Sequence, residues 1–381
     1  MARVSPKRST AQPVIEELEP RDLPSIFTPA DIRHVYGFDN VRFGSVAGNG
    51  AGQTIAIVEA FHDPRITVDL REFDKAFNFH DPVFTQVEPE GATSVNADWA
   101  METALDVEWA HAVAPGAKIL LVETRSDSIS DLLGGVNYAR RQHGVAVVSM
   151  SWGLSESAIG SSFEKANDKV FTTPAGHTGV TFTAATGDDG GQFGPEWPAS
   201  SPNVLSVGGT SLQLGSRGNY ARETAWPSGG GGQSSVEREP IYQRNVQKTG
   251  MRTTTDVSIV ADPNTGLYVY DTVPLDRQTG FFQVGGTSAG APMWAGLIAI
   301  ADQGRAREGK ATASRSSLDG ATDTLRALYA LPRTDFHDVT AGANDTGAAR
   351  PGYDLATGLG TPIADRVIAG LLKVSAVSRQ A

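Results

Sequence analysis

The stretch KILLVETRSDSISDLLGGVNYARRQHGVAVVSMS (residues 118–151) contains two short apolar runs with a helix-like segment between them. The end runs, KILLVET (118–124) and VAVVSMS (145–151), are rich in aliphatic and β-branched residues, as buried strands are. The segment 128–142 has a helical pattern. A strand, a helix and a strand in this order predict two parallel strands joined by a crossover helix.

The same alternation continues on both sides of this unit. Further strand-like runs are TIAIVEA (54–60), VTFTAAT (180–186) and NVLSVGG (203–209). Further helix-like segments span 63–79, 97–113 and 160–173. We therefore expect an α/β fold with a central, mostly parallel sheet and helices on both of its faces. The pattern becomes irregular over 215–282, which includes the glycine run SGGGGQSS (228–235), and it is loop-like from 336 onward.

The composition excludes several classes of protein. No apolar run approaches the roughly 20 residues that a membrane span needs. The net charge of −11 is opposite to the basic footprint of a nucleic-acid binder. The chain has no cysteine, which excludes thiol catalysis, disulfides and cysteine-ligated zinc. We expect a monomer with neither a nucleic-acid nor a membrane partner.

The first 26 residues differ from the rest of the chain. They are polar and lack the apolar core of a signal peptide, so we expect a disordered leader or tail before a single domain over 27–381. The piece EELEPRDLPS (16–25) resembles a short leader motif at the start of some bacterial envelope proteins. Together with the absence of cysteine, it favours an extracellular or cell-envelope location.

A candidate nucleophile lies in GGTSAGAP (285–292). Ser288 stands among small residues that allow close approach, at the predicted start of a helix whose N–H groups and dipole favour negative charge. The alternative is an ordinary N-cap serine. The helix is expected to run from Ser288 to about Gln303, with Gly304 as the residue just beyond its end.

No histidine of the chain is an evident base for activating this serine. GTSxxxP is shared with subtilisin-type peptidases, whose histidine begins an HGT-like helix. None of the seven histidines has that context, and His111 is expected to be a half-buried packing residue. The histidines are at positions 34, 62, 80, 111, 143, 177 and 337.

Three acidic residues are better candidates. Glu102 and Asp106 lie one helical turn apart in METALDVEW (101–109) and project from one face. Such a pair is usually solvated surface, but this helix is too apolar to be freely exposed, and a buried pair should share a proton. Asp188 follows a predicted strand in AATGDDGG (184–191), where parallel sheets place binding groups, although an Asp-Gly turn is the plain alternative.

Glu102-xxx-Asp106, Gly187-Asp188 and Gly286-Thr287-Ser288 resemble, in order and spacing, the motifs of the sedolisins, the serine-carboxyl peptidases of family S53. The resemblance spans roughly 27–372. VVSMSWG (147–153) is similar to the family's substrate-binding strand and turn, and PASSPNVLSVGGTS (198–211) to the strand that follows its aspartate. The resemblance to the sedolisins implies a subtilisin-like fold. It also implies a calcium-stabilised endopeptidase that cleaves peptides or unfolded proteins in acid. Residues before 27 leave no room for the family's long prodomain, so a form without it is expected.

The resemblance also implies the role of each residue. Ser288 would be the nucleophile, Glu102 its base, Asp106 the residue that orients the base, and Asp188 a protonated oxyanion donor. Substrate would contact Ser151, Trp152 and Gly153. One Ca²⁺ would be held by FHDVTAG (336–342) and GYDLATGLGTP (352–362). Its ligands would be the side chains of Asp338 and Asp354 and the carbonyl groups of Val339, Arg350 and Gly352.

Two other functions stay open from the sequence. One is a subtilisin-type Ser-His-Asp peptidase, against which the missing HGT histidine argues. The other is a catalytically silent binding protein on the same fold, against which the complete acidic set argues.

Overall fold

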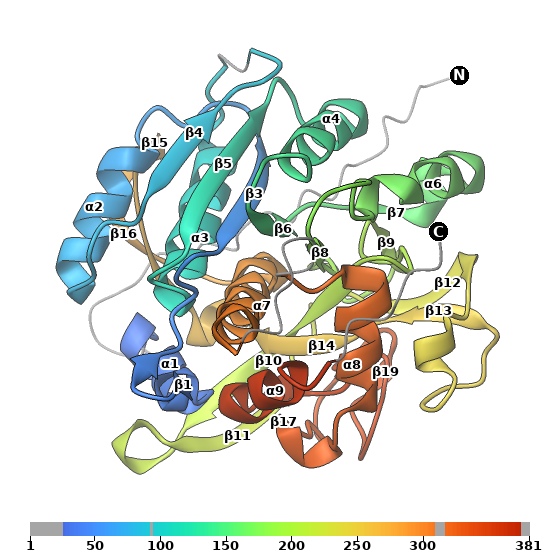
Figure 1. Cartoon of the computed structure of the whole chain (residues 1–381). Helices are drawn as coiled ribbons and strands as arrows, with labels where there is room; N and C mark the ends of the chain where they lie inside the picture. The colour runs from blue at the N-terminus through green and yellow to red at the C-terminus, as the bar shows by residue number, and fades with distance from the viewer. Residues whose placement is uncertain (1–25, 92–93, 309–316, 375–381) are drawn as a thin grey trace.

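A computed structural model describes residues 26–91, 94–308 and 317–374, and its centre is an eight-stranded sheet (Figure 1). The strands follow the order β11-β10-β8-β6-β3-β5-β4, and β14 also pairs with β10. Only the β10–β11 pair is antiparallel, so the predicted parallel sheet is confirmed. The strands are β3 (Thr54–Ala60), β4 (Phe84–Val87), β5 (Lys118–Thr124), β6 (Val145–Met150), β8 (Thr181–Ala185), β10 (Leu205–Leu214), β11 (Tyr220–Ala225) and β14 (Val257–Val260).

Both faces of the sheet are covered, which is why its strands read as continuous apolar runs. Successive side chains of a strand point to opposite faces. Thus Ile55 and Ile57 of β3 join the core formed with α3 (Ala97–Val113) and α7 (Gly290–Arg307). Ala56 and Val58 join a second core with α4 (Ile129–Ala139) on the other face.

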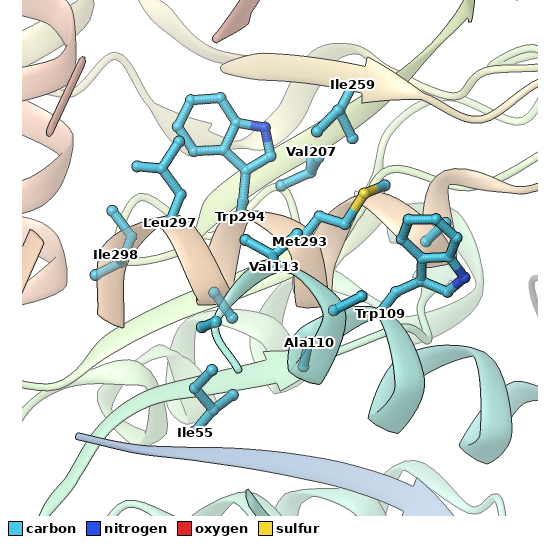
Figure 2. Close-up of a cluster of buried hydrophobic side chains, with 14 of the residues drawn as sticks. Ile55, Trp109, Ala110, Val113, Val207, Ile259, Met293, Trp294, Leu297 and Ile298 are labelled. Carbon is cyan, nitrogen blue, oxygen red and sulfur yellow. The ribbon is translucent and has the colours of Figure 1, made fainter. Parts of the chain in front are cut away.

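Helices α3 and α7 pack against each other as well as against the sheet (Figure 2). Trp109 and Val113 of α3 lie beside Met293 and Trp294 of α7, and all four side chains are buried. A Cβ atom on Gly296 of α7 would lie only 2.7 Å from Val113 Cγ1, so glycine sets the close approach of the two helices. This contact fixes α3 relative to the turn that precedes α7.

The predicted end of α7 is wrong. The helix continues to Arg307, and Gly304 lies within it. A Cβ atom on Gly304 would be 2.4 Å from Phe43 Cε1 and 2.6 Å from Leu372 Cδ2. Gly304 therefore makes room for packing against the helix side and does not terminate it.

Three other predicted helices are shorter than expected. The segment 128–142 contains α4 (Ile129–Ala139). The segment 63–79 contains α2 (Ile66–Phe77). The segment 160–173 is divided into α6 (Ser161–Asn167) and a 3₁₀ turn over Asp168–Phe171. The carbonyl oxygens of Asp168 and Lys169 accept hydrogen bonds from the side chains of Asn203 (3.1 Å) and Thr172 (2.7 Å), so they do not continue the helical pattern.

The segment 215–282 is not irregular, because it forms several strands besides β11 and β14. Strand β12 (Gly232–Arg238) pairs with β13 (Met251–Thr254), and β15 (Leu267–Leu275) pairs with β16 (Gln278–Val284). Alternate residues of β15 are buried, which is the period of a half-buried antiparallel strand. LYVYDTVPL (267–275) therefore carried a strand signal that the prediction missed.

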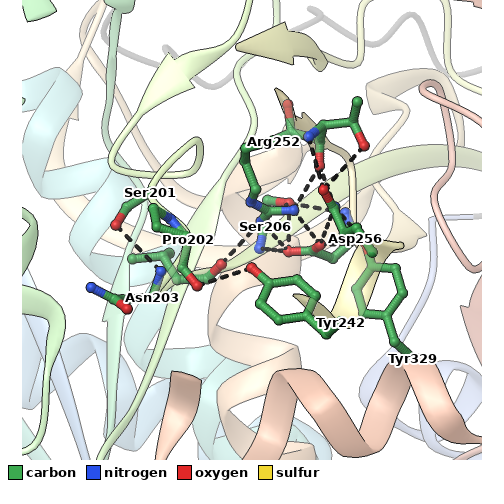
Figure 3. Close-up of polar contacts among 12 residues, drawn as sticks. Ser201, Pro202, Asn203, Ser206, Tyr242, Arg252, Asp256 and Tyr329 are labelled. Carbon is green, nitrogen blue, oxygen red and sulfur yellow. Dashed lines mark hydrogen bonds and ion pairs between the residues drawn. The ribbon is translucent and has the colours of Figure 1, made fainter. Parts of the chain in front are cut away.

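A buried ion pair anchors the segment between β13 and β14 (Figure 3). Both guanidinium Nη atoms of Arg252 lie 2.6 Å from the carboxylate oxygens of Asp256. The same carboxylate accepts hydrogen bonds from Ser206 Oγ of β10 (2.8 Å) and from Tyr329 Oη of α8 (Leu325–Ala330; 2.6 Å). Because every partner is buried or partly buried, the network ties this segment to the sheet and to the C-terminal helices.

The C-terminal part is not all loop. It ends in α9 (Ala364–Leu371) and contains a small hairpin, β18 (Ala343–Asn344) with β19 (Gly347–Ala348). The expected leader over 1–26 lies almost entirely outside the described residues. Among the helices that the structure describes, none is both long enough and apolar enough to cross a bilayer.

Candidate active site

Ser288 lies in a 3₁₀ turn, Thr287–Ala289, between β16 and α7. The α-helix begins at Gly290 and not at Ser288, because Ala289 N–H bonds to the carbonyl group of Gly286, three residues back (3.2 Å). Gly286 has a φ of +134°, which L side chains rarely adopt, and a Cβ atom there would lie 2.8 Å from Asp188 Oδ2. Glycine thus allows the Ser288 turn to approach Asp188.

Glu102 and Asp106 lie on α3, and both are buried. From Trp99 to Val113 every residue of this helix is buried, because it lies between the sheet, α7, α2 and β15. The pair is therefore not a solvated surface pair. Ionising both carboxyls at this spacing inside a protein costs much free energy, because the two negative charges repel each other in a medium that screens them poorly.

The environment of the pair favours its protonated form. Burial raises the pKa of Glu102 well above its usual range, and repulsion by Asp106 raises it further. Burial also raises the pKa of Asp106. Interaction with the Ser288 hydroxyl lowers the pKa of Glu102, although Ser288 Oγ forms no hydrogen bond of normal geometry with any described residue. Such contacts are often long or misaligned in unliganded sites.

A third buried carboxyl, Glu59 at the end of β3, extends this cluster and was missed by the sequence reasoning. Its pKa is raised well above the usual range by burial and by repulsion from Asp106 and Glu102. Among the described residues no N–H or O–H group bonds to either oxygen of Glu59 or Glu102. Carboxylates only accept, so these groups can bond to one another only by holding protons. A glutamate inside the apolar run TIAIVEA was the available signal.

The three predicted substrate-contact residues follow β6. Ser151 Oγ lies 2.6 Å from Asp106 Oδ2 and 3.0 Å from the carbonyl oxygen of Ser288, so it links the acidic pair to the turn that contains Ser288. Trp152 is buried, and its indole N–H donates to the carbonyl group of Val58 (2.9 Å). A Cβ atom on Gly153 would lie 2.6 Å from Glu196 Oε2. Contact of these residues with substrate stays a prediction.

Asp188 follows β8 and faces the turn that carries Ser288. Its Oδ1 accepts hydrogen bonds from Thr287 N–H and Thr287 Oγ1, both at 2.8 Å. Its Oδ2 is buried and has no hydrogen-bond partner within the described part of the chain. Burial raises the pKa of Asp188 to about 6, against the opposing effect of the Thr287 hydrogen bonds. In acid the free Oδ2 would carry a proton for which the described residues offer no acceptor.

The histidines have their partners elsewhere. His62 Nδ1 lies 2.7 Å from Glu123 Oε2, and the ring of His337 stacks on Tyr220. His111, expected to be half-buried, is fully buried, because α2 covers it and brings Asp74 Oδ1 to 3.1 Å from its Nε2. All seven histidines are described, and no hydrogen bond or ion pair joins any of them to Ser288.

The predicted calcium ligands lie in two loops that contact each other. Gly352 N–H donates to the Asp338 carboxylate (3.0 Å to Oδ2), and Arg350 N–H donates to Asp354 Oδ2 (3.0 Å). Among the described residues no hydrogen bond is accepted by the carbonyl oxygens of Val339, Arg350 and Gly352. Two carboxylates with three free carbonyl oxygens form a donor set of the kind that Ca²⁺ prefers, so the residues fit the ion.

Comparison with known sequences identifies the family of the chain. Residues 92–334 match the model of the subtilase family. The chain is 34% identical to kumamolisin of Bacillus sp. (strain MN-32) over 92% of its length and 64% of the relative's. It is 28% identical to sedolisin of Pseudomonas sp. (strain 101) over 85% of its length and 58% of the relative's. The chain thus spans less than two thirds of these relatives.

The solved structure of Pseudomonas sedolisin, a serine-carboxyl proteinase complexed with pseudo-iodotyrostatin, superposes on this chain with a TM-score of 0.78. The two are 26% identical, and the match covers 91% of this chain and 98% of the other. A lanthipeptide protease shares the fold alone, at 14% identity and a TM-score of 0.57. The chain has a subtilisin-like α/β fold; it belongs to the subtilase family, and its relatives place it with the sedolisins.

Proposed function

We propose that this chain is the catalytic domain of a serine-carboxyl endopeptidase that hydrolyses peptide bonds in acid. One arrangement carries the proposal: Ser151 bonds to Asp106 of the buried acidic pair and to the carbonyl group of Ser288, and no described histidine bonds to Ser288. A serine beside a buried carboxyl whose pKa is raised has a base matched to acidic conditions. The similar Pseudomonas sedolisin structure is described as a serine-carboxyl proteinase, which supports the same reaction.

In the proposed first step, Ser288 Oγ attacks the carbonyl carbon of the scissile bond while Glu102 accepts the hydroxyl proton. The C–N bond then breaks, and Glu102 returns that proton to the leaving amine. Water hydrolyses the resulting acyl-enzyme by the same proton path. Asp106 shares a proton with Glu102 and holds it in place, and Ser151 in turn bonds to Asp106.

The oxyanion of the tetrahedral intermediate is proposed to bond to Asp188. Because Thr287 occupies Oδ1, the proton of the neutral acid belongs on Oδ2, which has no other partner among the described residues. A neutral carboxylic acid donates a hydrogen bond, whereas a carboxylate would repel the developing charge. The backbone N–H of Ser288 is the proposed second donor.

Calcium and substrate complete the proposal. A structural Ca²⁺ ion would tie the loops of Asp338 and Asp354 together through oxygen ligands. Extended peptides or unfolded proteins would lie along Ser151, Trp152 and Gly153. An acidic extracellular or cell-envelope setting would suit carboxyls that work while partly protonated.

The test is peptide hydrolysis by the purified, calcium-loaded protein from about pH 3 to about pH 8, with Ser288→Ala and Glu102→Gln beside the wild type. We expect activity confined to acid, abolished in Ser288→Ala and reduced at least about a thousandfold in Glu102→Gln. Activity that peaks near neutrality and survives Glu102→Gln would reject the carboxyl base. A folded protein without activity at any pH would indicate a silent binding protein.

A further inference from the structure

The glycine run at 228–232 has no role in the reaction described above, yet it brackets Asp188. Gly230 N–H donates to the carbonyl group of Gly187, and Gly190 N–H donates to the carbonyl group of Ser228, both at 2.7 Å. One hydrogen bond lies before Asp188 and the other after it. The backbone that carries Asp188 is therefore fixed on both sides by the same short segment.

The close fit explains why this segment consists of glycine. A Cβ atom on Gly230 would lie 2.0 Å from the carbonyl oxygen of Thr186, at the end of β8. Gly231 has a φ of +149°, and its Cβ atom would lie 2.7 Å from the carbonyl oxygen of Leu355. Any side chain here would push the strand end away from the C-terminal loops.

The β18–β19 hairpin holds this bracket from the other side. Asn344 Nδ2 donates to the carbonyl group of Gly229 (2.7 Å), and Asp345 N–H donates to the carbonyl group of Gly190 (3.0 Å). The Asn344 amide is itself oriented, because its Oδ1 accepts from Thr346 N–H (3.0 Å) and Thr346 Oγ1 (2.5 Å). One side chain thus connects the hairpin to the glycine run.

The position of this hairpin in the chain connects the Asn344 contact to the proposed calcium loops. It lies between Asp338 and Asp354, the two carboxylates of the proposed calcium loops. The base of the hairpin is closed by the hydrogen bond from Ala349 N–H to the carbonyl group of Gly342 (3.0 Å), where the chain continues into these loops. The covalent chain leads from the loops to Asn344, whose hydrogen bond reaches Gly229, and the adjacent Gly230 bonds to Gly187 beside Asp188.

We propose that Asn344 is a positioning residue for Asp188, and that it couples the order of the 338–354 loops to the oxyanion donor. The inference rests on the proposed function, in which Asp188 donates to the oxyanion. Without the Asn344 amide, the bracket loosens and Asp188 Oδ2 departs from the direction that the transition state requires. Substrate binding depends on other groups and changes little.

The experiment compares Asn344→Ala with Asn167→Ala, a control that removes an equivalent hydrogen bond, from Asn167 Nδ2 to the carbonyl group of Phe163 (2.8 Å), in α6. We expect kcat of Asn344→Ala to fall about tenfold with KM changed less than about twofold, and the control to match the wild type. A third variant, Asn344→Asp, can donate to Gly229 only as a neutral acid. Its activity relative to wild type should therefore fall as pH rises, whereas that of Asn344→Ala stays constant.

Amide hydrogen exchange provides a readout that needs no activity. The Gly190 and Gly230 N–H groups should exchange at least about tenfold faster in Asn344→Ala than in the wild type or in Asn167→Ala. Unchanged exchange at these two amides, or an unchanged kcat in a folded variant, would overturn the proposal. If the wild type hydrolyses no peptide, the proposed function fails, while the exchange comparison still decides whether Asn344 holds the Asp188 backbone.

Discussion

Ser151 Oγ lies 2.6 Å from Asp106 Oδ2 and is also within 3.0 Å of the Ser288 carbonyl oxygen. A hydroxyl has one proton, and the carbonyl group can only accept. Ser151 Oγ therefore divides its single proton between two acceptors, the Asp106 carboxylate and the Ser288 carbonyl oxygen. The bond from Ser151 favours the charged carboxylate and lowers the pKa of Asp106, whereas burial, the larger effect, raises this pKa to about 7.

From this relationship we predict that Ser151→Ala lowers kcat about tenfold, since it leaves Asp106 without one of its bonds. Ser200→Ala is the matched control, because Ser200 is a buried serine whose hydroxyl donates to another carboxylate, Glu164 (3.1 Å). Both variants should lose a similar amount of thermal stability. Only Ser151→Ala should lose activity in a steady-state assay at acidic pH, and equal activities would argue against the role of Ser151.

A second prediction concerns the alkaline limit of activity. The pKa of Asp188 is about 6, so its donor proton is present below this pH and is lost above it. Asp188→Asn keeps an N–H donor at every pH, provided that the amide nitrogen occupies the Oδ2 position. We expect a lower kcat in acid, because an amide is a weaker donor than an acid, and a ratio of variant to wild-type kcat that rises above about pH 6. A ratio that is constant with pH would exclude ionisation of Asp188 as the cause of the limit.

The sheet could be predicted from the sequence because its strands are buried on both faces. TIAIVEA and VAVVSMS are continuous apolar runs, and no helix competes for so short a length. The hairpin β15–β16 was not predicted because its half-buried strands form no continuous apolar run, and two aspartates and a proline interrupt the region. The end of α7 was misplaced because Gly304 serves packing against Phe43, which no local pattern encodes.

The acidic pair and Asp188 could be located because their spacing along α3 and after β8 is local. Glu59 could not be placed beside Asp106, since that contact joins residues of different elements through the sheet. For the same reason the glycine run could be seen in the sequence, whereas its position beside Asp188 in the fold could not. The run pairs with Gly187 and Gly190, about 40 residues earlier in the chain.

The third prediction is that buried acids make the fold less stable as pH rises. Asp302 of α7 is buried, and burial raises its pKa from 3.8 to about 8. Between these values the folded state holds a proton that the unfolded state has released. The contribution of Asp302 to the free energy of unfolding is thus fully present below about pH 4 and is lost progressively up to about pH 8. The free energy of unfolding falls by at most about 1.4 kcal/mol per pH unit from this group.

Asp302→Asn should remove this dependence, since the amide oxygen can still accept from Leu318 N–H. We expect a higher midpoint of thermal unfolding than wild type at about pH 8, and no gain at about pH 4. Asp39→Asn, at an exposed carboxylate that pairs with Arg33, is the control and should show no such difference. If the Asp302 variant is stabilised equally at both pH values, its effect is not due to ionisation.

The last prediction concerns calcium. Because the ion would bind the folded loops and not the unfolded chain, its removal should lower the free energy of unfolding by about 3 kcal/mol when it was present at about a hundred times its Kd. For a domain of this size that is a fall in Tm of several degrees, measured near neutral pH, where a chelator competes well.

The double variant Asp338→Asn, Asp354→Asn should have the lower Tm already and should not respond to chelator. Asp276→Asn, in the exposed turn between β15 and β16, should respond as the wild type does. A wild-type Tm that is the same with calcium and with chelator would contradict the calcium site.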